Sequence, residues 1–154
     1  MFTGKAESTR LKIKSFERIC FIIYAGKVDQ YENKLRSLLE SLNDVMKEGE
    51  TSHPALLILI LFCIRILIIR LSQNVLNKMF KTIWPSLMTL LMQIFERRKI
   101  ARNPNLILAG LKVIELVTAM ELEEFNLLKW IFIFDCNDLA DVDFGLQVDT
   151  LPVE

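Results

Sequence analysis

One stretch decides the fold of this chain: His53-Pro54-Ala55-Leu56-Leu57-Ile58-Leu59-Ile60-Leu61-Phe62-Cys63-Ile64-Arg65-Ile66-Leu67-Ile68-Ile69-Arg70-Leu71. From Ala55 onward its side chains are apolar except for two arginines, Arg65 and Arg70. A run of this kind forms a membrane span, a buried strand, or a helix that its neighbours cover on nearly all sides. These structures imply different classes of protein, so the choice among them comes first.

The positions of the arginines favour a buried helix. A transmembrane helix needs about 20 consecutive apolar residues, whereas ten precede Arg65 here and only four separate it from Arg70. Each arginine near the bilayer centre costs about 2.5–3.5 kcal/mol, and a strand is usually only about four to eight residues long. We therefore expect a helix covered by other helices, with a single transmembrane helix at residues 54–71 as the alternative.

Apolar residues at helical spacing predict two helices before this stretch. The first covers Ala6–Ala25 and ends at Gly26, because glycine favours helix C-termini. Asp29 is expected to cap the second helix, with Glu32 three residues later. The apolar residues near one face of the first helix are Leu11, Phe16, Ile19, Cys20, Ile23 and Tyr24, and the single stripe of the second is Tyr31, Leu35, Leu38, Leu39, Leu42 and Val45.

Caps and prolines mark the later helices. Ser52 or His53 is expected to cap the third helix, with Pro54 in its first turn, and Asn103-Pro104 repeats this start for the fifth. The helical pattern of the fourth runs through Pro85, which predicts one bent helix or two short coaxial ones. Glu124–Phe134 is expected to be a sixth helix, although its aromatic and β-branched end also suits an extended segment.

The alternation of helices with one apolar stripe and helices that are apolar nearly all round predicts an all-α fold of five to six antiparallel helices. Helical hairpins stacked as in a HEAT- or armadillo-like solenoid segment account for it, because their inner helices are covered on several sides. We expect the helical domain at residues 1–134. Residues 135–154 carry six acids and no lysine or arginine, which predicts an acidic, disordered tail.

No residues form a catalytic pattern. The single histidine, His53, is expected to cap a helix or to lie on the surface. The spacing of Cys20, Cys63 and Cys136 indicates neither a zinc site nor a disulfide framework, and the first two are expected to be buried, reduced thiols. The net charge of zero, from 19 basic and 19 acidic residues, argues against a nucleic-acid-binding protein. We expect no enzyme, no cofactor, no metal and no small-molecule substrate.

Two groups of residues are candidates for binding or for structure. The basic cluster Arg97, Arg98, Lys99 and Arg102 is either a solvated helix end or a contact with an acidic partner or acidic lipid headgroups, where each charge contributes about 1 kcal/mol. We expect structural roles in the core or at helix ends for Arg65, Arg70, Trp84, Pro85 and Trp130. In the buried helix the two arginines are expected to reach the protein edge or to pair with acids such as Glu40 or Glu115.

Several short motifs keep one order between Leu11 and Phe134. They are the run Phe62–Ser72 with its two arginines and final serine; Ile83-Trp84-Pro85; Val28-Asp29-Gln30-Tyr31 followed by Leu35 and Leu39–Leu42; Lys112–Leu116; and Lys129–Ile133. In this order they resemble the C-terminal region of the Dopey proteins. That family has a similar run with two arginines followed by serine, then Leu-Trp-Pro, an Ile-Asp-Gln-Tyr helix upstream, and Lys-Phe-Leu-Asp-Leu and Arg-Trp-Ala-Phe-Ile downstream.

The resemblance implies a non-catalytic helical-solenoid scaffold that acts in vesicle-mediated protein traffic between endosomes and the trans-Golgi. It implies a peripheral location on the cytosolic face of trans-Golgi and early-endosome membranes. The implied partners are a large Arf-exchange-factor-like Golgi scaffold and a phospholipid flippase, with lipid-headgroup contact and without nucleic acid. An unrelated helical adaptor is the remaining alternative.

The chain departs from the Dopey pattern in three places. The family's N-terminal domain is absent, the segment after the Leu-Trp-Pro helix is reduced to Lys99–Asn105, and the chain ends in an acidic tail without a basic C-terminal helix. These departures fit a fragment, a truncated gene model or a divergent short paralogue.

Overall fold

The computed structural model describes residues 3–49, 52–95, 103–121 and 125–126 of the chain. This part contains helices and no strands, which confirms the all-α class predicted from the sequence. Its helices are α1 (Thr3–Ala25), α2 (Glu32–Glu48), α3 (Pro54–Arg70), α4 (Gln73–Phe95) and α5 (Pro104–Ala119). The sixth helix predicted at Glu124–Phe134 lies outside the described residues except for Phe125 and Asn126, and the tail at 135–154 lies wholly outside them.

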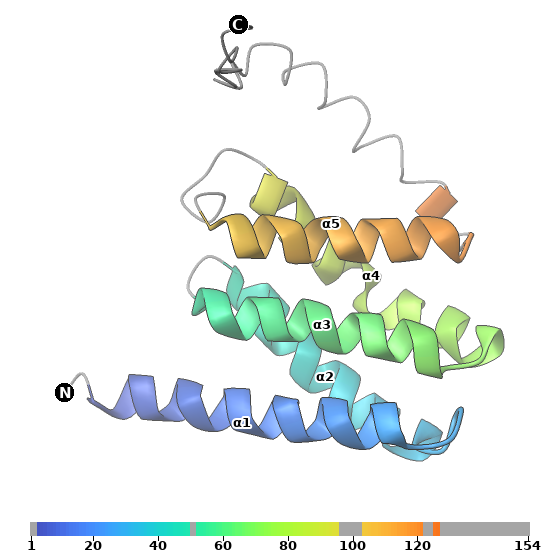
Figure 1. The fold of residues 1–154 in the computed structure, drawn as a ribbon, viewed down its shortest axis with the longest axis horizontal. Coiled ribbons are helices and arrows are strands. Elements are labelled where there is room, and N and C mark those ends of the chain that lie inside the picture. The colour runs from blue at the N-terminus through green and yellow to red at the C-terminus, as the bar shows by residue number, and fades with distance from the viewer. Residues whose placement is uncertain (1–2, 50–51, 96–102, 122–124, 127–154) are drawn as a thin grey trace, which may run out of the picture.

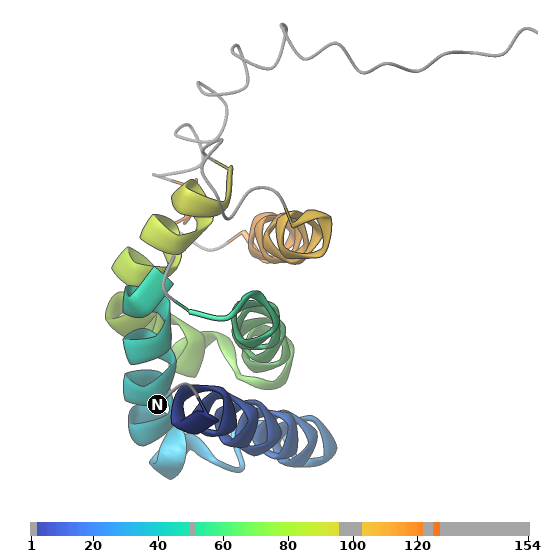
Figure 2. The same cartoon turned by 90° about the vertical axis from the view of Figure 1, so that its left-hand side faces the viewer.

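The helices form two layers. Helices α1, α3 and α5 lie side by side and run in the same direction (Figure 1), and α2 and α4 lie behind them and pack on each other. Figure 2 shows α1, α3 and α5 nearly end-on in one column, with α2 and α4 in a second column beside it. Helix α3 is central, because α1 packs on one side of it, α5 on the other, and α2 behind it.

The central position of α3 explains why its sequence is almost entirely apolar. Neighbours on three sides bury most of its side chains, and only Phe62 and Ile69 are large apolar residues exposed on it. The buried residues of α3 are Leu56, Leu57, Ile60, Leu61, Cys63, Ile64, Ile66, Leu67 and Ile68. None of the helices in the described part combines the length and apolarity needed to cross a membrane, which does not favour the single-span alternative.

The predicted helix starts at the two X-Pro sequences are confirmed. The ring nitrogen Nδ1 of His53 accepts a hydrogen bond from the backbone N–H of Ala55 at 3.3 Å, with Pro54 in the first turn of α3. The side-chain oxygen of Asn103 accepts from two backbone amides of α5 at 3.0 and 3.3 Å. A proline costs nothing in a first turn, because its missing N–H would have no partner inside the helix.

Helix α4 is one helix through Pro85, which agrees with the first of the two predicted alternatives and excludes two separate coaxial helices. Pro85 has no N–H to donate to the carbonyl one turn earlier, and its ring lies on an exposed part of the helix. The next turn closes normally, and the hydroxyl of Thr89 donates to the Pro85 carbonyl at 2.9 Å. The buried face of α4, which packs on α2 and α5, therefore continues past the proline.

Two predictions for the first helices are wrong. Leu11 and Tyr24 do not lie on the buried face of α1 with Phe16 and Cys20, because both are exposed. Asp29 does not cap α2: the helix begins after Tyr31 without a side-chain cap. Asp29 instead adopts a left-handed backbone conformation, with φ of 57°, and its carboxylate points to the start of α4. Local spacing did not reveal this long-range partner.

Candidate binding groove and interhelical contacts

Arg70 joins two helix-to-helix turns that are far apart in the sequence. Its Nη2 donates a hydrogen bond to the backbone carbonyl of Gly26, which directly follows α1. The backbone N–H of Asp29 donates to the Arg70 carbonyl at 3.4 Å, and the Asp29 carboxylate accepts from the N–H of Ser72 at 2.8 Å. A cation is favourable beside the partial negative charge of a helix C-terminus. These contacts hold the α1–α2 turn against the α3–α4 turn.

The Asp29 carboxylate is stabilised in its charged form. Hydrogen bonds from the side chain and the backbone N–H of Ser72 hold the pKa of Asp29 below its ordinary value. Ser72 directly precedes α4, so the negative charge also lies at a helix N-terminus, where it is favourable. Asp29 therefore helps to hold the α1–α2 turn against the α3–α4 turn.

Arg65 lies on α3 and is partly buried. Within the described part of the chain, no ion pair joins it to Glu40 or Glu115, and its Nε has no hydrogen-bond partner there. Glu40 pairs instead with Arg36 on its own helix, at 3.3 Å. The two arginines of α3 therefore have different environments: among the described residues, Arg70 is the one of the two with a hydrogen bond to another segment.

Trp84 is buried on α4 and contacts Phe125 edge-to-face, with the ring centroids 5.9 Å apart. This geometry is the preferred one for an aromatic pair. The contact packs Phe125 against α4, and the burial of Trp84 agrees with a structural role in the core. Pro85, its neighbour, is exposed, and Trp130 lies outside the described residues.

The basic cluster also lies outside the described residues. Its position between α4 and α5 is known only from the sequence, and its role in binding stays a prediction. Its members are Arg97, Arg98, Lys99 and Arg102.

An apolar groove of about 970 Å³ lies between α1 and α2. These helices are consecutive, but each packs mainly on another helix, α1 on α3 and α2 on α4. The separation leaves exposed side chains of α1 on the groove, with Leu11 61% and Ile22 49% accessible. Helix α2 contributes the partly buried Leu38, and Tyr31, which directly precedes α2, also lines the groove.

The groove has a balanced polar border. Its charged residues are two acids and two lysines, Glu7, Lys12, Lys34 and Asp44, and its small polar residues are Ser8, Ser15, Ser37 and Ser41. Small side chains allow a docked segment to approach the helix backbones closely. The groove is suited to an elongated apolar partner with polar edges.

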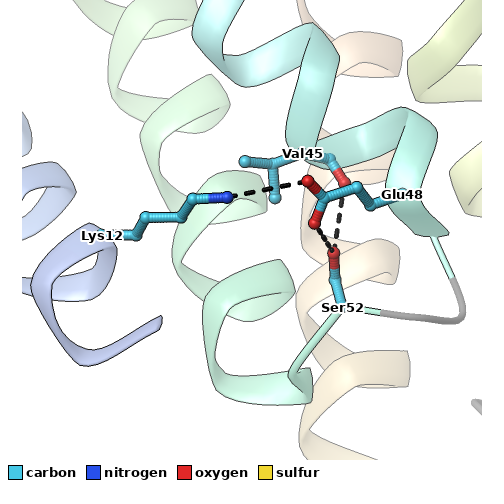
Figure 3. Close-up of polar contacts among 4 residues, drawn as sticks. All are labelled: Lys12, Val45, Glu48 and Ser52. Atoms are coloured by element: carbon cyan, nitrogen blue, oxygen red, sulfur yellow. Dashed lines mark hydrogen bonds and ion pairs between the residues drawn. The ribbon is translucent and has the colours of Figure 1, made fainter. Parts of the chain in front are cut away.

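A polar contact closes one end of the α1–α2 pair (Figure 3). The ammonium group of Lys12 lies 3.6 Å from the carboxylate of Glu48, and the Ser52 hydroxyl donates to the other oxygen of that carboxylate at 3.2 Å. The Val45 carbonyl lies 3.5 Å from the same hydroxyl. This cluster ties α1 to the end of α2 and the start of α3. Its ion pair is about half exposed, so its contribution to stability is small.

The two described cysteines, Cys20 and Cys63, form a hydrogen-bonded pair in the core that lowers the pKa of the Cys20 thiol. Cys20 and Cys63 are buried, free thiols, as predicted. The pKa of the Cys63 thiol is raised far above its ordinary value, first by its hydrogen bond to Cys20 and then by burial, so its reactive thiolate is suppressed. No group of three or more His, Cys, Asp or Glu side chains in the described part is arranged to hold a metal ion.

The sequence profile described as DOP1 C-terminal matches residues 1–144, nearly the whole chain. This chain belongs to the DOP1 C-terminal family. The match agrees with the resemblance to the C-terminal region of the Dopey proteins, and it removes the alternative of an unrelated helical adaptor.

The chain is also similar to two curated proteins. It is 24% identical over 89 residues to "Protein pad-1" of Caenorhabditis elegans and 22% identical over 89 residues to "Protein pad-1" of Caenorhabditis briggsae. The matched residues are 58% of this chain but only 3% and 4% of these relatives, so the chain spans a small part of their length. No solved structure matches it.

Sequence reasoning missed the groove, although a signal for it exists. Leu11 and Ile22 are eleven residues apart, three helical turns, and therefore share a face of α1. Phe16 and Ile23 are buried but line the same groove. The apolar surface of α1 is therefore wider than the part that its packing on α3 covers.

Proposed function

We propose that this chain is a non-catalytic scaffold segment that acts in vesicle-mediated protein traffic between endosomes and the trans-Golgi. The single observation that carries the proposal is the DOP1 C-terminal match over residues 1–144. The function itself comes from the resemblance to Dopey proteins, and the helical architecture agrees with it.

In this proposal the helices form a HEAT- or armadillo-like solenoid segment. Support comes from the two-layer order, in which α1, α3 and α5 lie side by side and α2 packs on α4 behind them. Stacked helical pairs present long surfaces for other proteins, since each pair contacts only its neighbours. A scaffold role follows from such surfaces and needs no catalytic residue.

The proposed partners are an Arf-exchange-factor-like Golgi scaffold and a phospholipid flippase. The proposed location is the cytosolic face of trans-Golgi and early-endosome membranes, with peripheral contact between anionic headgroups and the basic cluster at residues 97–102. Four cations near an anionic surface contribute about 1 kcal/mol each, enough to support reversible attachment.

Proximity labelling tests the trafficking role. The full chain is fused to a biotin ligase and expressed in cells, with the ligase alone as the control. We expect Golgi and early-endosome membrane proteins to be enriched over this control. Labelling that recovers no protein of either compartment would contradict the proposed function.

Vesicle flotation tests the headgroup contact. The variant Arg97→Glu/Arg98→Glu/Lys99→Glu/Arg102→Glu is compared with wild type on vesicles of phosphatidylcholine with and without phosphatidylserine. Its apparent affinity for the anionic vesicles is expected to fall at least about a hundredfold. The control Arg10→Glu/Lys14→Glu/Lys27→Glu/Lys81→Glu has the same change in net charge at exposed positions. Equal losses in both variants would show that net charge, not the cluster, determines binding.

A further inference from the structure

Helix α3 has one side that no helix of the described part covers. Helices α1, α2 and α5 pack on its other sides, and Figure 1 looks onto the open side, with α2 and α4 behind. Four residues of this side follow one another at spacings of four, three and four, namely Ile58, Phe62, Arg65 and Ile69. Side chains at such spacings lie along one stripe of a helix. We call these residues the α3 stripe.

The α3 stripe is largely apolar and open to solvent. Phe62 is 47% exposed and Ile69 is 56% exposed, whereas Ile58 and Arg65 are partly buried. The stripe extends about 17 Å, or three turns, at 1.5 Å per residue. Alternating spacings of four and three residues are those of a coiled-coil seam, along which a second helix packs. The shape and length of the stripe therefore suit a helix that lies along α3.

Arg65 gives this surface its chemical preference. Its Nε is shielded from solvent and has no hydrogen-bond partner in the described part of the chain. A shielded donor without an acceptor is unfavourable. A carboxylate is the acceptor that matches a guanidinium best, because it takes two parallel hydrogen bonds from it. Arg65 lies on the open stripe, so such an acceptor can approach from outside the fold.

We propose that the α3 stripe binds an amphipathic helix of a partner protein, with one Asp or Glu of that helix opposite Arg65. Large apolar residues one turn before and one turn after this acid contact Phe62 and Ile69, as in other complexes of a helix with a helical surface. The ion pair fixes the register. A helix shifted by one turn would leave both charges among apolar side chains, which is costly.

The same observations do not favour a lipid surface at this site. Attachment to anionic lipids depends on several cations close to the headgroups. The α3 stripe has one cation, and the Nε of that cation is shielded from solvent. The proposal concerns a surface separate from the basic cluster at residues 97–102 and goes beyond the proposed trafficking function, because it rests on described residues of α3.

Selection from a phage-displayed library of helices, with the full chain as the target, tests the proposal. Each helix has about five turns, and three positions of one face, at spacings of three and four residues, are randomised. We expect enriched helices to have an acid at the middle position and large apolar residues at the outer two. Enriched helices without an acid at the middle position, or no enrichment, would overturn the proposal.

Variants of the chain locate the binding surface. Phe62→Ser/Ile69→Ser is expected to weaken binding of the selected helix at least about tenfold in fluorescence anisotropy, with unchanged helix content by circular dichroism. The matched control Leu11→Ser/Ile22→Ser changes two similarly exposed apolar residues on α1, at 61% and 49%, and is expected to bind like wild type. Equal effects of the two double variants would contradict binding at the α3 stripe.

A charge exchange tests the ion pair and does not depend on the double variant. Replacing the acid of the selected helix by its amide is expected to raise the dissociation constant for wild type at least about tenfold, but to have little effect with Arg65→Met. Arg65→Glu is expected to prefer a helix with lysine at the middle position. The same preference for the acid in wild type and Arg65→Met would overturn the proposal. Loss of vesicle flotation in Phe62→Ser/Ile69→Ser, with helix binding unchanged, would assign the stripe to a membrane instead.

Discussion

At the scale of single residues, Arg70 makes a contact between segments that are far apart in the sequence. Its backbone belongs to the apolar helix α3, and its side chain donates a hydrogen bond to the carbonyl of Gly26, 44 residues earlier in the sequence. Replacing it by methionine keeps much of its apolar stem but leaves that carbonyl without its cationic donor. We predict that Arg70→Met lowers the free energy of unfolding by about 1.5–3 kcal/mol, measured by urea denaturation.

Arg36 supplies the control for this prediction. It also forms one polar contact, but its side chain is 92% exposed and its partner is Glu40 on the same helix. Arg36→Met is expected to change stability by less than about 0.5 kcal/mol. Equal effects of the two substitutions would refute a special role for the Arg70 contact.

The turn between α1 and α2 has room for glycine at position 26, and any larger residue there would require a rearrangement. A Cβ atom on Gly26 would lie 2.6 Å from Cε2 of Tyr31, which is closer than atoms pack. We predict that Gly26→Ala destabilises the chain by displacing Tyr31 and the Arg70 contact. Thermal unfolding measures the change, and Ala25→Gly, at an exposed position one residue earlier, is the control. A melting temperature for Gly26→Ala equal to that of wild type would contradict this close approach.

Asp29 gives the structure a predictable response to acid. Its pKa is lower in the folded chain than in the unfolded chain, so its charge stabilises the fold above its ordinary pKa of about 3.9. This contribution is lost as the pH falls through the folded-state pKa. Asp29→Asn keeps a hydrogen-bond acceptor and tolerates the left-handed backbone, so it removes mainly the charge.

We therefore predict that Asp29→Asn is less stable than wild type at pH 7 and that the difference shrinks below about pH 3. Urea denaturation at both values measures it. A difference that is the same at both pH values would show that the charge of Asp29 does not contribute.

At the scale of elements, α3 packs on α1, α2 and α5 and contributes a large part of the buried core. Ile64 at its centre is fully buried, whereas Phe62, two residues away, is exposed. We predict that Ile64→Ala costs about 2–5 kcal/mol, because it removes packed methyl groups and leaves a cavity. Phe62→Ala is expected to cost less than about 1 kcal/mol. Reversed magnitudes in urea denaturation would mean that α3 buries a different face.

The elements also show what the sequence predicts and why. The starts of α3 and α5 followed from His53-Pro54 and Asn103-Pro104, because capping is decided within a few residues. The buried character of α3 followed from its uniform apolarity. The role of Asp29 was predicted wrongly, because its partner Ser72 lies 43 residues away. Local sequence propensities contain no information about a contact between residues so far apart.

At the scale of the whole molecule, the groove could not be predicted from the sequence. It exists because α1 and α2 pack on different helices and diverge, which depends on the positions of all the helices together. The width of the apolar surface of α1 was visible in the sequence, but the position of α2 beside it was not. For the Arg97–Arg102 cluster, sequence alone predicts a role, and vesicle flotation decides it.

Amide hydrogen exchange of the full chain in aqueous buffer tests the central claim most directly, namely that Pro54–Arg70 is the buried centre of a helical stack. The account predicts that amides at residues 60–67 exchange most slowly, and only through global unfolding, so that their opening free energy equals that from urea denaturation. Helix α1, whose groove side is open, is expected to exchange faster. Exchange in the centre of α3 as fast as in the first turns of α1 would contradict the account.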